Sequence, residues 1–241
     1  MISFKELGSL GRRRNMYFQA ATTIALAKRN NDDYIFPICE LIGTTNIPIE
    51  KFTNIINYSK SYQEPYFHYK EIPYSPNMNL GGSYFQSYKY FEDYKQEIIN
   101  LFMPIPHFNR EEGLCGIHCR RGDYVKLQNF HPLQTMHYYQ KAMELSGCSK
   151  FLIFSDDINW CKQNFKGNQF DFAEGNSEVS DLALMAKKCS DIIIANSSFS
   201  WWGAYLNQNL NKKVFYPSNW FGPNLAHHNT KDLCPPEWIK L

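Results

Sequence analysis

Short apolar runs alternate with helix-length segments throughout the second half of the chain. The apolar runs at residues 114–118, 151–154, 191–195 and 214–216 are predicted strands. The segments between them predict helices at residues 135–145, 158–165 and 178–189. Strands that alternate with helices indicate an α/β fold with a parallel, doubly wound sheet.

The first half begins with the same alternation of strands and helices, which is no longer visible after about residue 40. Residues 3–7 and 34–36 are predicted strands on either side of a helix over residues 16–29. Residues 40–110 are rich in proline and tyrosine, with a further helix expected at residues 88–102. Their aromatic rings could pack in an ordinary core or stack on sugars. For any single ring, the core is the commoner use. We expect two domains, residues 1–110 and 111–241.

Composition excludes several classes of function. The chain has 241 residues with 25 basic and 23 acidic side chains, so nothing indicates a nucleic-acid partner. No apolar run approaches the ~20 residues that span a bilayer, and the N-terminal residues lack the apolar core of a signal peptide. The seven cysteines are scattered and include no Cys-x-x-Cys pair, which predicts reduced thiols and no metal or cofactor. We therefore expect a cytoplasmic protein.

Residues 118–124 are the main candidate for chemistry. The strand at 114–118 ends in a histidine, His118, which Arg120, Arg121 and Asp123 follow. Open α/β sheets bind ligands at the carboxyl ends of their strands, and paired guanidinium groups match phosphate oxygens. A structural arginine–aspartate pair in a loop explains the same residues equally well.

Two further strand ends carry polar residues. Asn196, Ser197 and Ser198 open a predicted helix, whose free N–H groups suit a phosphate, although plain N-capping explains them too. With His118 and Ser155 they outline a nucleotide-diphosphate pocket. The acidic pair at 156–157 lacks the Asp-x-Asp spacing of a metal site, and its second residue suits the first turn of a helix.

With these motifs in view, the chain resembles the glycosyltransferase family 11 α-1,2-fucosyltransferases over residues 4–241. The matching segments are residues 77–80, 84–87, 118–124, 154–157, 194–204 and 219–222. The resemblance implies a GT-B-like fold of two Rossmann-like domains, with residues 1–110 on the acceptor side and 111–241 binding GDP-fucose. It also implies inverting, metal-independent transfer of L-fucose from GDP-β-L-fucose to a terminal galactose hydroxyl of a glycan. Peripheral membrane association would be compatible with such a substrate.

The resemblance also implies roles for individual residues. His118 and Asp181 would hold guanine, and Arg120 would contact the β-phosphate. Asp123 would act as the general base or would only orient an arginine. The remaining implied site residues are Arg121, Asn196, Ser197, Ser198 and Phe199 for the donor, and the catalytic Arg12 and Asn15 in the first turn.

One position departs from the family pattern. Arg14 stands where the first turn has a second glycine. Arginine would strain the backbone if φ there is positive, or would block the site if the backbone approaches the sugar there. One alternative to a fucosyltransferase is therefore an impaired homologue that only binds a glycan or nucleotide. Another nucleotide-sugar transferase with the same fold is a separate alternative.

Overall fold

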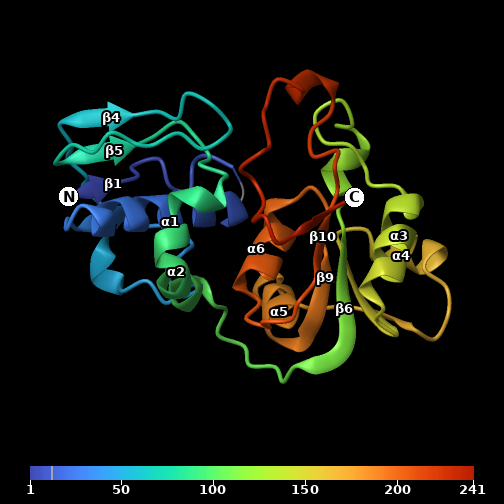
Figure 1. Ribbon diagram of the computed structural model, residues 1–241. Coiled ribbons are helices and arrows are strands. Elements are labelled where there is room, and N and C mark those ends of the chain that lie inside the picture. Colours follow the sequence, from blue (N-terminus) through green and yellow to red (C-terminus); the bar gives the residue numbers. More distant parts are fainter. Residues whose placement is uncertain (12) are drawn as a thin grey trace. The chain divides into compact units, whose positions relative to one another are not determined.

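The computed structural model describes residues 1–11 and 13–241, which form two units (Figure 1). The first unit comprises Met1–Met103 and His228–Pro235, and the second comprises Pro104–His227 and Pro236–Leu241. The main division thus falls at residues 103–104, against the expected 110–111, and residues 228–235 join the first unit. Arg12, a predicted catalytic residue, lies outside the described residues.

The second unit contains a six-stranded sheet in the order β11-β10-β9-β6-β7-β8, and its strand pairings are parallel. Counted from β6, this is the strand order of the Rossmann fold, in which the winding reverses beside the first strand, here between β6 and β9. The strands are β6 (Glu111–Cys119), β7 (Lys150–Ser155), β8 (Phe170–Phe172), β9 (Cys189–Ile193), β10 (Val214–Tyr216) and β11 (Ile239–Lys240).

Helices cover both faces of this sheet, with α3 and α4 on one side and α5 and α6 on the other (Figure 1). They are α3 (Met136–Ser146), α4 (Ile158–Asn164), α5 (Glu178–Ala183) and α6 (Ser198–Leu206). The central strands are largely buried on both faces, so their buried stretches, such as residues 151–154 of β7, are mainly apolar in the sequence. Cys115, Ile117, Ile153 and Ile193 form the core under α3 and α4.

The predicted helix at 178–189 is shorter and less regular than expected. Helix α5 continues as one π-helical segment, Leu184–Lys188, and β9 begins directly after it. The buried Asn207 holds this segment: its Nδ2 donates to the carbonyl of Met185, within the segment, at 3.0 Å and to that of Cys189, directly after it, at 2.8 Å. Nζ of Lys187 donates to the carbonyl of Pro104 at 2.6 Å, which ties this segment to the chain that enters the unit.

The first unit contains a five-stranded sheet in the order β3-β2-β1-β5-β4, also with parallel pairings. Its strands are β1 (Ile2–Ser3), β2 (Tyr34–Pro37), β3 (Phe52–Thr53), β4 (Lys60–Tyr62) and β5 (Met78–Leu80), and its α-helices are α1 (Arg13–Arg29) and α2 (Lys95–Phe102). The region that looked irregular therefore supplies three of the five strands. The predicted helix at 88–102 is two 3-10 turns, Tyr88–Tyr90 and Glu92–Tyr94, followed by α2. Further 3-10 turns are Ile49–Lys51, Gly122–Val125 and Pro223–Leu225.

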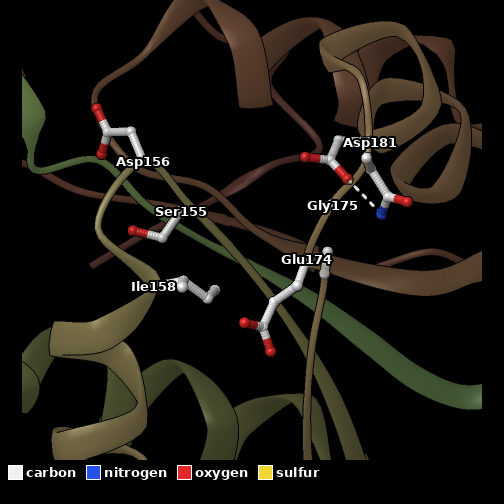
Figure 2. Close-up of a pocket in the computed structure, with 8 residues that line it drawn as sticks. Ser155, Asp156, Ile158, Glu174, Gly175 and Asp181 are labelled. Atoms are coloured by element: carbon white, nitrogen blue, oxygen red, sulfur yellow. Dashed lines mark hydrogen bonds between the residues drawn. The ribbon is translucent and has the colours of Figure 1, made fainter.

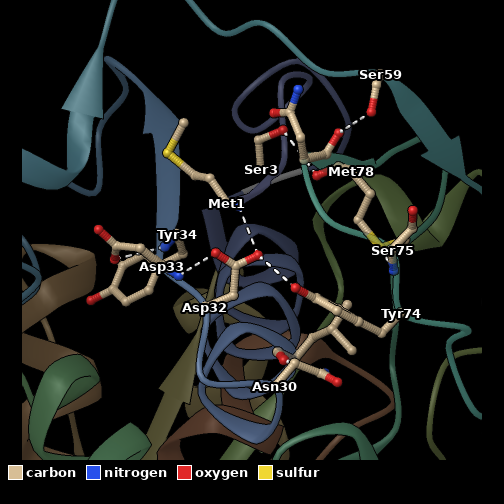
Figure 3. Close-up of polar contacts among 12 residues, drawn as sticks. Met1, Ser3, Asn30, Asp32, Asp33, Tyr34, Ser59, Tyr74, Ser75 and Met78 are labelled. Atoms are coloured by element: carbon tan, nitrogen blue, oxygen red, sulfur yellow. Dashed lines mark hydrogen bonds and ion pairs between the residues drawn. The ribbon is translucent and has the colours of Figure 1, made fainter.

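Polar contacts close the amino-terminal edge of this sheet (Figure 3). Asp32, in the turn before β2, accepts from the amino group of Met1 at 2.7 Å and from the hydroxyl of Tyr74 at 3.2 Å. The next residue, Asp33, accepts from the backbone N–H of Tyr34 at 2.8 Å. These contacts fix the turn between α1 and β2 and leave the opposite edge for the loops that follow β1 and β5.

The segment His228–Pro235 packs into the first unit through both its backbone and its side chains. The hydroxyl of Ser87 donates to the carbonyl of Asp232 at 2.7 Å, and Nζ of Lys89 pairs with the buried Asp232 carboxylate at 2.6 Å. The rings of Phe67 and His228 stack with centroids 5.1 Å apart. This segment is thus an integral part of the first unit.

Candidate active site

The topology brings three predicted strand ends together in the second unit. Strands β7, β6 and β9 are neighbours, and Cys119 pairs in register with Ser155 while Ile117 pairs with Ile193. The polar residues that follow these strands therefore meet at the carboxyl edge, where the winding reverses. This is the position at which open α/β sheets bind ligands.

His118, the penultimate residue of β6, lies at this edge and is 4% exposed. Its Nδ1 lies 2.9 Å from the hydroxyl oxygen of Ser200, and its ring centroid lies 5.2 Å from that of Phe199. Burial, with a smaller effect from the charge of Arg120, lowers the pKa of His118 to about 3. The imidazole is therefore neutral near pH 7, with one nitrogen as donor and the other as acceptor.

Arg120 is held between two carboxylates. Its Nη2 lies 2.6 Å from Oδ1 of Asp123, and its Nη1 lies 2.8 Å from Oδ2 of Asp156. The guanidinium also lies 5.2 Å from the ring of Tyr124. Three neighbours thus fix the direction of this cation. The contact with Asp123 is the arginine–aspartate pair that the sequence left open, and a phosphate contact for Arg120 stays a prediction.

Arg121 points to a different set of partners. Its Nε donates to Oδ2 of Asp157 at 3.0 Å, and its guanidinium carbon lies 3.9 Å from the Trp160 ring centroid. The same Asp157 caps α4 by accepting from the backbone N–H of Trp160 at 3.2 Å. The sequence predicted this acid in the first turn of the helix, and the structure places it at the N-cap, one position earlier. These contacts fasten α4 to the arginine motif, and a substrate contact for Arg121 stays a prediction.

The side chain of Asn196 is occupied by the surrounding loops. Its Nδ2 donates to the carbonyls of Pro132 and Trp220 at 3.1 and 3.0 Å, and its Oδ1 accepts from Nε2 of Gln134 at 3.0 Å. The side chain is buried, so its evident role is to hold these loops, and direct contact with substrate stays a prediction.

The next residues open α6. Ser197 is the N-cap and accepts from the backbone N–H of Phe199 at 3.4 Å, while Ser198 and Phe199 are partly exposed. The first N–H groups of a helix lack partners within the helix and favour an anion. The start of α6 therefore offers donors at the same sheet edge as His118.

A pocket of about 260 Å³ adjoins this edge beyond β7 and β8 (Figure 2). Figure 2 shows the carboxyl groups of Asp156, Glu174 and Asp181 arranged around it. Asp181 accepts from Nδ2 of Asn176 at 3.0 Å, and burial raises the pKa of Asp181. A half-buried carboxylate in such a pocket can accept hydrogen bonds from N–H groups of a planar base.

Sequence reasoning missed two contacts of this site. It did not pair Asp156 with Arg120, although the parallel register of Cys119 with Ser155 makes the two following residues neighbours. It also missed Ser200, which lies one helical turn after the Ser197 cap and contacts His118. Among the described residues, no group of three or more His, Cys, Asp or Glu side chains is placed to hold a metal ion.

The predicted first turn lies in the first unit. Oδ1 of Asn15 accepts from Nε2 of Gln86 at 2.8 Å. The positive φ of this turn, 79°, belongs to Gly11, whereas Arg14 lies inside α1 and is not among the residues with positive φ. The concern that Arg14 strains the backbone is therefore wrong. Its side chain is 2% exposed, and its guanidinium carbon lies 4.6 Å from the centroid of the Tyr17 ring.

Two parallel sheets of Rossmann type, with paired arginines at the carboxyl edge of the second, are the architecture of a GT-B-like protein. The family model for glycosyl transferase family 11 matches residues 44–241, and the chain belongs to this family. The apo crystal structure of POFUT1 superimposes with a TM-score of 0.50 at 12% identity, covering 89% of this chain and 97% of that one, which supports the fold.

Three curated relatives illustrate the range of the family. The O-antigen biosynthesis glycosyltransferase WbnK of Escherichia coli is 38% identical over 137 residues, which cover 52% of this chain but only 44% of WbnK. An α-1,2-colitosyltransferase of Escherichia coli is 32% identical over 80% of this chain and 73% of its own length. Galactoside α-(1,2)-fucosyltransferase 2 of Oryctolagus cuniculus is 24% identical over 98% of this chain and 76% of its own length.

None of the helices in the described residues is both long enough and apolar enough to span a membrane.

Proposed function

We propose that this protein transfers L-fucose from GDP-β-L-fucose to a galactose hydroxyl of a glycan and forms an α-1,2 linkage. The observation that carries the proposal is the fixed guanidinium of Arg120 at the reversal point of the second sheet, close to the start of α6. The names of the relatives supply the sugar and the linkage.

The donor would lie along the carboxyl edge of the second sheet. Guanine would enter the pocket beside Asp181, whose carboxylate suits the paired N–H donors of that base. The neutral ring of His118 would offer a further polar contact. The diphosphate would then lie against Arg120 and the N–H groups that open α6.

This arrangement fits the charge changes of glycosyl transfer. The sugar passes through an oxocarbenium-like state while negative charge collects on the departing nucleotide. Arg120 already points in a fixed direction, so stabilising that charge requires little reorganisation. The positive charge comes from a side chain, and we therefore propose a reaction that does not depend on a metal ion.

Inversion would follow from a single displacement in which the acceptor hydroxyl attacks opposite the phosphate. A carboxylate or imidazole would take the proton of that hydroxyl. Asp123 lies close enough to the donor site to be considered, but its Oδ1 contacts Arg120 at 2.6 Å. This contact favours the orienting role for Asp123.

A second candidate sugar is colitose. The α-1,2-colitosyltransferase of Escherichia coli is 32% identical over 80% of this chain, a higher identity than that of the galactoside fucosyltransferase 2 from Oryctolagus cuniculus. Both sugars would use the same nucleotide pocket, so the choice between them depends on residues that contact the sugar ring.

The deciding measurement is release of GDP from GDP-fucose and from GDP-colitose, in the presence of EDTA, across a panel of galactose-terminated acceptors. Acceptor-dependent release from GDP-fucose, with an α-1,2 product by NMR, would support the proposal. Release from GDP-colitose alone would select the second candidate. Calorimetric binding of GDP without release from either donor would identify a binding homologue, and activity that EDTA abolishes would contradict metal independence.

A further inference from the structure

A histidine without an assigned role lies at the carboxyl edge of the second sheet. His131 is in the loop between the 3-10 turn Gly122–Val125 and α3. Its ring stacks on that of Tyr124, with centroids 4.8 Å apart and planes 16° apart. The Tyr124 centroid in turn lies 5.2 Å from the guanidinium carbon of Arg120. The two distances together place the histidine ring no more than about 10 Å from that cation.

Backbone contacts hold His131 in this position. Its N–H donates to the carbonyl of Leu127 at 2.8 Å. The carbonyl of the next residue, Pro132, accepts from Nδ2 of the buried Asn196 at 3.1 Å. The hydroxyl of Tyr124 donates to the carbonyl of Asn196, also at 3.1 Å. Both rings of the stack are therefore anchored to the same residue, which lies between β9 and α6.

A second loop packs closely against the histidine loop. A Cβ at Gly222 would lie 2.5 Å from two backbone oxygens of the histidine loop, so another residue would require the backbone to move. The N–H of Gly222 donates to the carbonyl of Phe130 at 2.9 Å. The neighbouring ring of Phe221 has its centroid 6.1 Å from that of His131. The position of the imidazole is thus determined by two loops rather than by a single contact.

The nitrogens of this imidazole are available to a ligand. Neither of them has a hydrogen-bond partner among the described residues. Tyr124 covers a face of the ring, whereas the nitrogens lie on its edge. The side chain is partly exposed, and neither nitrogen is a fully buried atom. The structure therefore holds the ring in a defined place without using its polar atoms.

The imidazole of His131 is able to accept a proton near pH 7. Burial lowers its pKa below the usual 6.5, and the charge of Arg120 adds to this effect. The carboxylate of Asp123 acts in the opposite direction, and these two are the charged groups that shift the pKa within the described chain. The neutral form therefore predominates at pH 7. Asp123 would also stabilise the imidazolium that forms when a proton arrives.

The geometry of an inverting displacement limits where a base can lie. The attacking hydroxyl and the departing phosphate are on opposite sides of the sugar carbon, so a base lies about 8–10 Å from a cation on that phosphate. Asp123 contacts Arg120 at 2.6 Å and so lies on the side of the leaving group. His118 is buried against Ser200 with a pKa of about 3, which makes it a poor base. His131 lies one ring further from the cation, within the required distance.

We propose that His131 is the general base of the transfer. An unprotonated nitrogen of its ring takes the proton of the acceptor hydroxyl while that oxygen forms a bond to the anomeric carbon of the donor sugar. The bond from the anomeric carbon to the β-phosphate oxygen breaks, and its electron pair leaves with GDP. The imidazolium then gives its proton to water. This assignment rests on the proposed function.

The test is the substitution His131→Phe, with His137→Phe as its control. Phenylalanine keeps an aromatic ring beside Tyr124 but has no nitrogen to accept a proton. His137 is an exposed histidine on α3, in the same unit. The measurements are kcat and kcat/KM against pH with the donor that supports GDP release, GDP affinity by calorimetry, and the pKa of His131 by NMR titration.

We expect His131→Phe to lower kcat about a hundredfold or more, since a positioned base contributes about 10²–10⁴. GDP affinity should stay within about twofold, and His137→Phe should match the wild type. Protonation removes the base, so the wild-type kcat/KM should fall as the pH drops through the pKa of His131 that NMR gives. The variant should lack this acid limb. If His131→Phe does not fold, His131→Gln should show the same losses.

A folded His131→Phe or His131→Gln protein with kcat within about threefold of the wild type would overturn the assignment and leave the proposed function standing. An acid limb that persists in the variant, or one that differs from the NMR pKa, would also overturn it. Equal losses of GDP affinity and kcat would show that the ring only supports the donor site. If the wild type transfers neither fucose nor colitose, the proposed function fails and this assignment fails with it.

Discussion

The substitution Arg120→Lys tests the donor site most directly. An Arg120→Ala substitution would leave the carboxylates of Asp123 and Asp156 without the cation between them. The protein would then lose stability as well as activity, and the two effects could not be separated. Lysine keeps the charge but replaces two separate nitrogen donors with a single ammonium group. A single ammonium group cannot contact both carboxylates as the guanidinium fork does and also reach the β-phosphate of a donor, as we propose for Arg120.

The structure sets the expected size of the effect. The side chain of Arg120 is 16% exposed and is directed by carboxylates at 2.6 and 2.8 Å, so in the proposed reaction it would act as a preorganised donor with little solvent around it. Removal of one such donor from a transition-state contact costs about 10²–10³ in kcat, or about 2.7–4 kcal/mol. Because lysine retains the charge, we expect the lower end, a loss of about a hundredfold in kcat/KM.

The assay is initial-rate GDP release at fixed acceptor, with GDP affinity measured by calorimetry and folding by thermal denaturation. Arg110→Lys is the matched control, since Arg110 is exposed and lies before β6 at the other end of the sheet. A folded Arg120→Lys protein with kcat/KM within about threefold of the wild type would refute the phosphate role of Arg120.

Three further predictions concern other parts of the molecule. Asp181→Asn should weaken GDP binding about tenfold and leave pyrophosphate binding unchanged by calorimetry; equal losses for both ligands would remove Asp181 from the base pocket. Burial raises the pKa of Glu64 to about 7 from its usual 4.5, so the folded state holds this proton more tightly and stability falls as pH rises from about 4.5 to 7. The effect is on the order of 3 kcal/mol, and urea denaturation of Glu64→Gln should lack that pH dependence; a slope identical to wild type would contradict the assignment. Gly11→Ala should lower the free energy of unfolding by about 1–2 kcal/mol or more, because φ is 79° and the new Cβ would meet Asn15 and Tyr84; unchanged urea denaturation would contradict this.

The fold of the second unit could be predicted from its sequence because its central strands are buried on both faces. The buried stretches of β6 and β7, residues 114–117 and 151–154, then appear as apolar runs, and polar residues follow them. In the first unit, β1 has two residues and β4 has three, which is too short to show a period of alternation. Those strands are defined by backbone pairing with neighbouring strands, β1 with β2 and β5, and β4 with β5.

The candidate site could be predicted in outline but not in its contacts. The sequence indicates that arginines and helix-capping residues follow strand ends, and this places Arg120 correctly at the sheet edge. It does not show that Arg121 turns toward Trp160, or that every side-chain polar atom of Asn196 is used by loops. Such outcomes depend on strand register and on loops from distant parts of the chain, which residue types alone do not encode.

The division of the chain has a consequence for its synthesis. The first unit includes His228–Pro235, and Asp232 from that segment contacts Ser87 and Lys89. During translation, the first 103 residues leave the ribosome long before this segment does. The first unit therefore lacks residues 228–235 until most of the second unit has been synthesised. Its final packing is therefore a late event in the biogenesis of the protein.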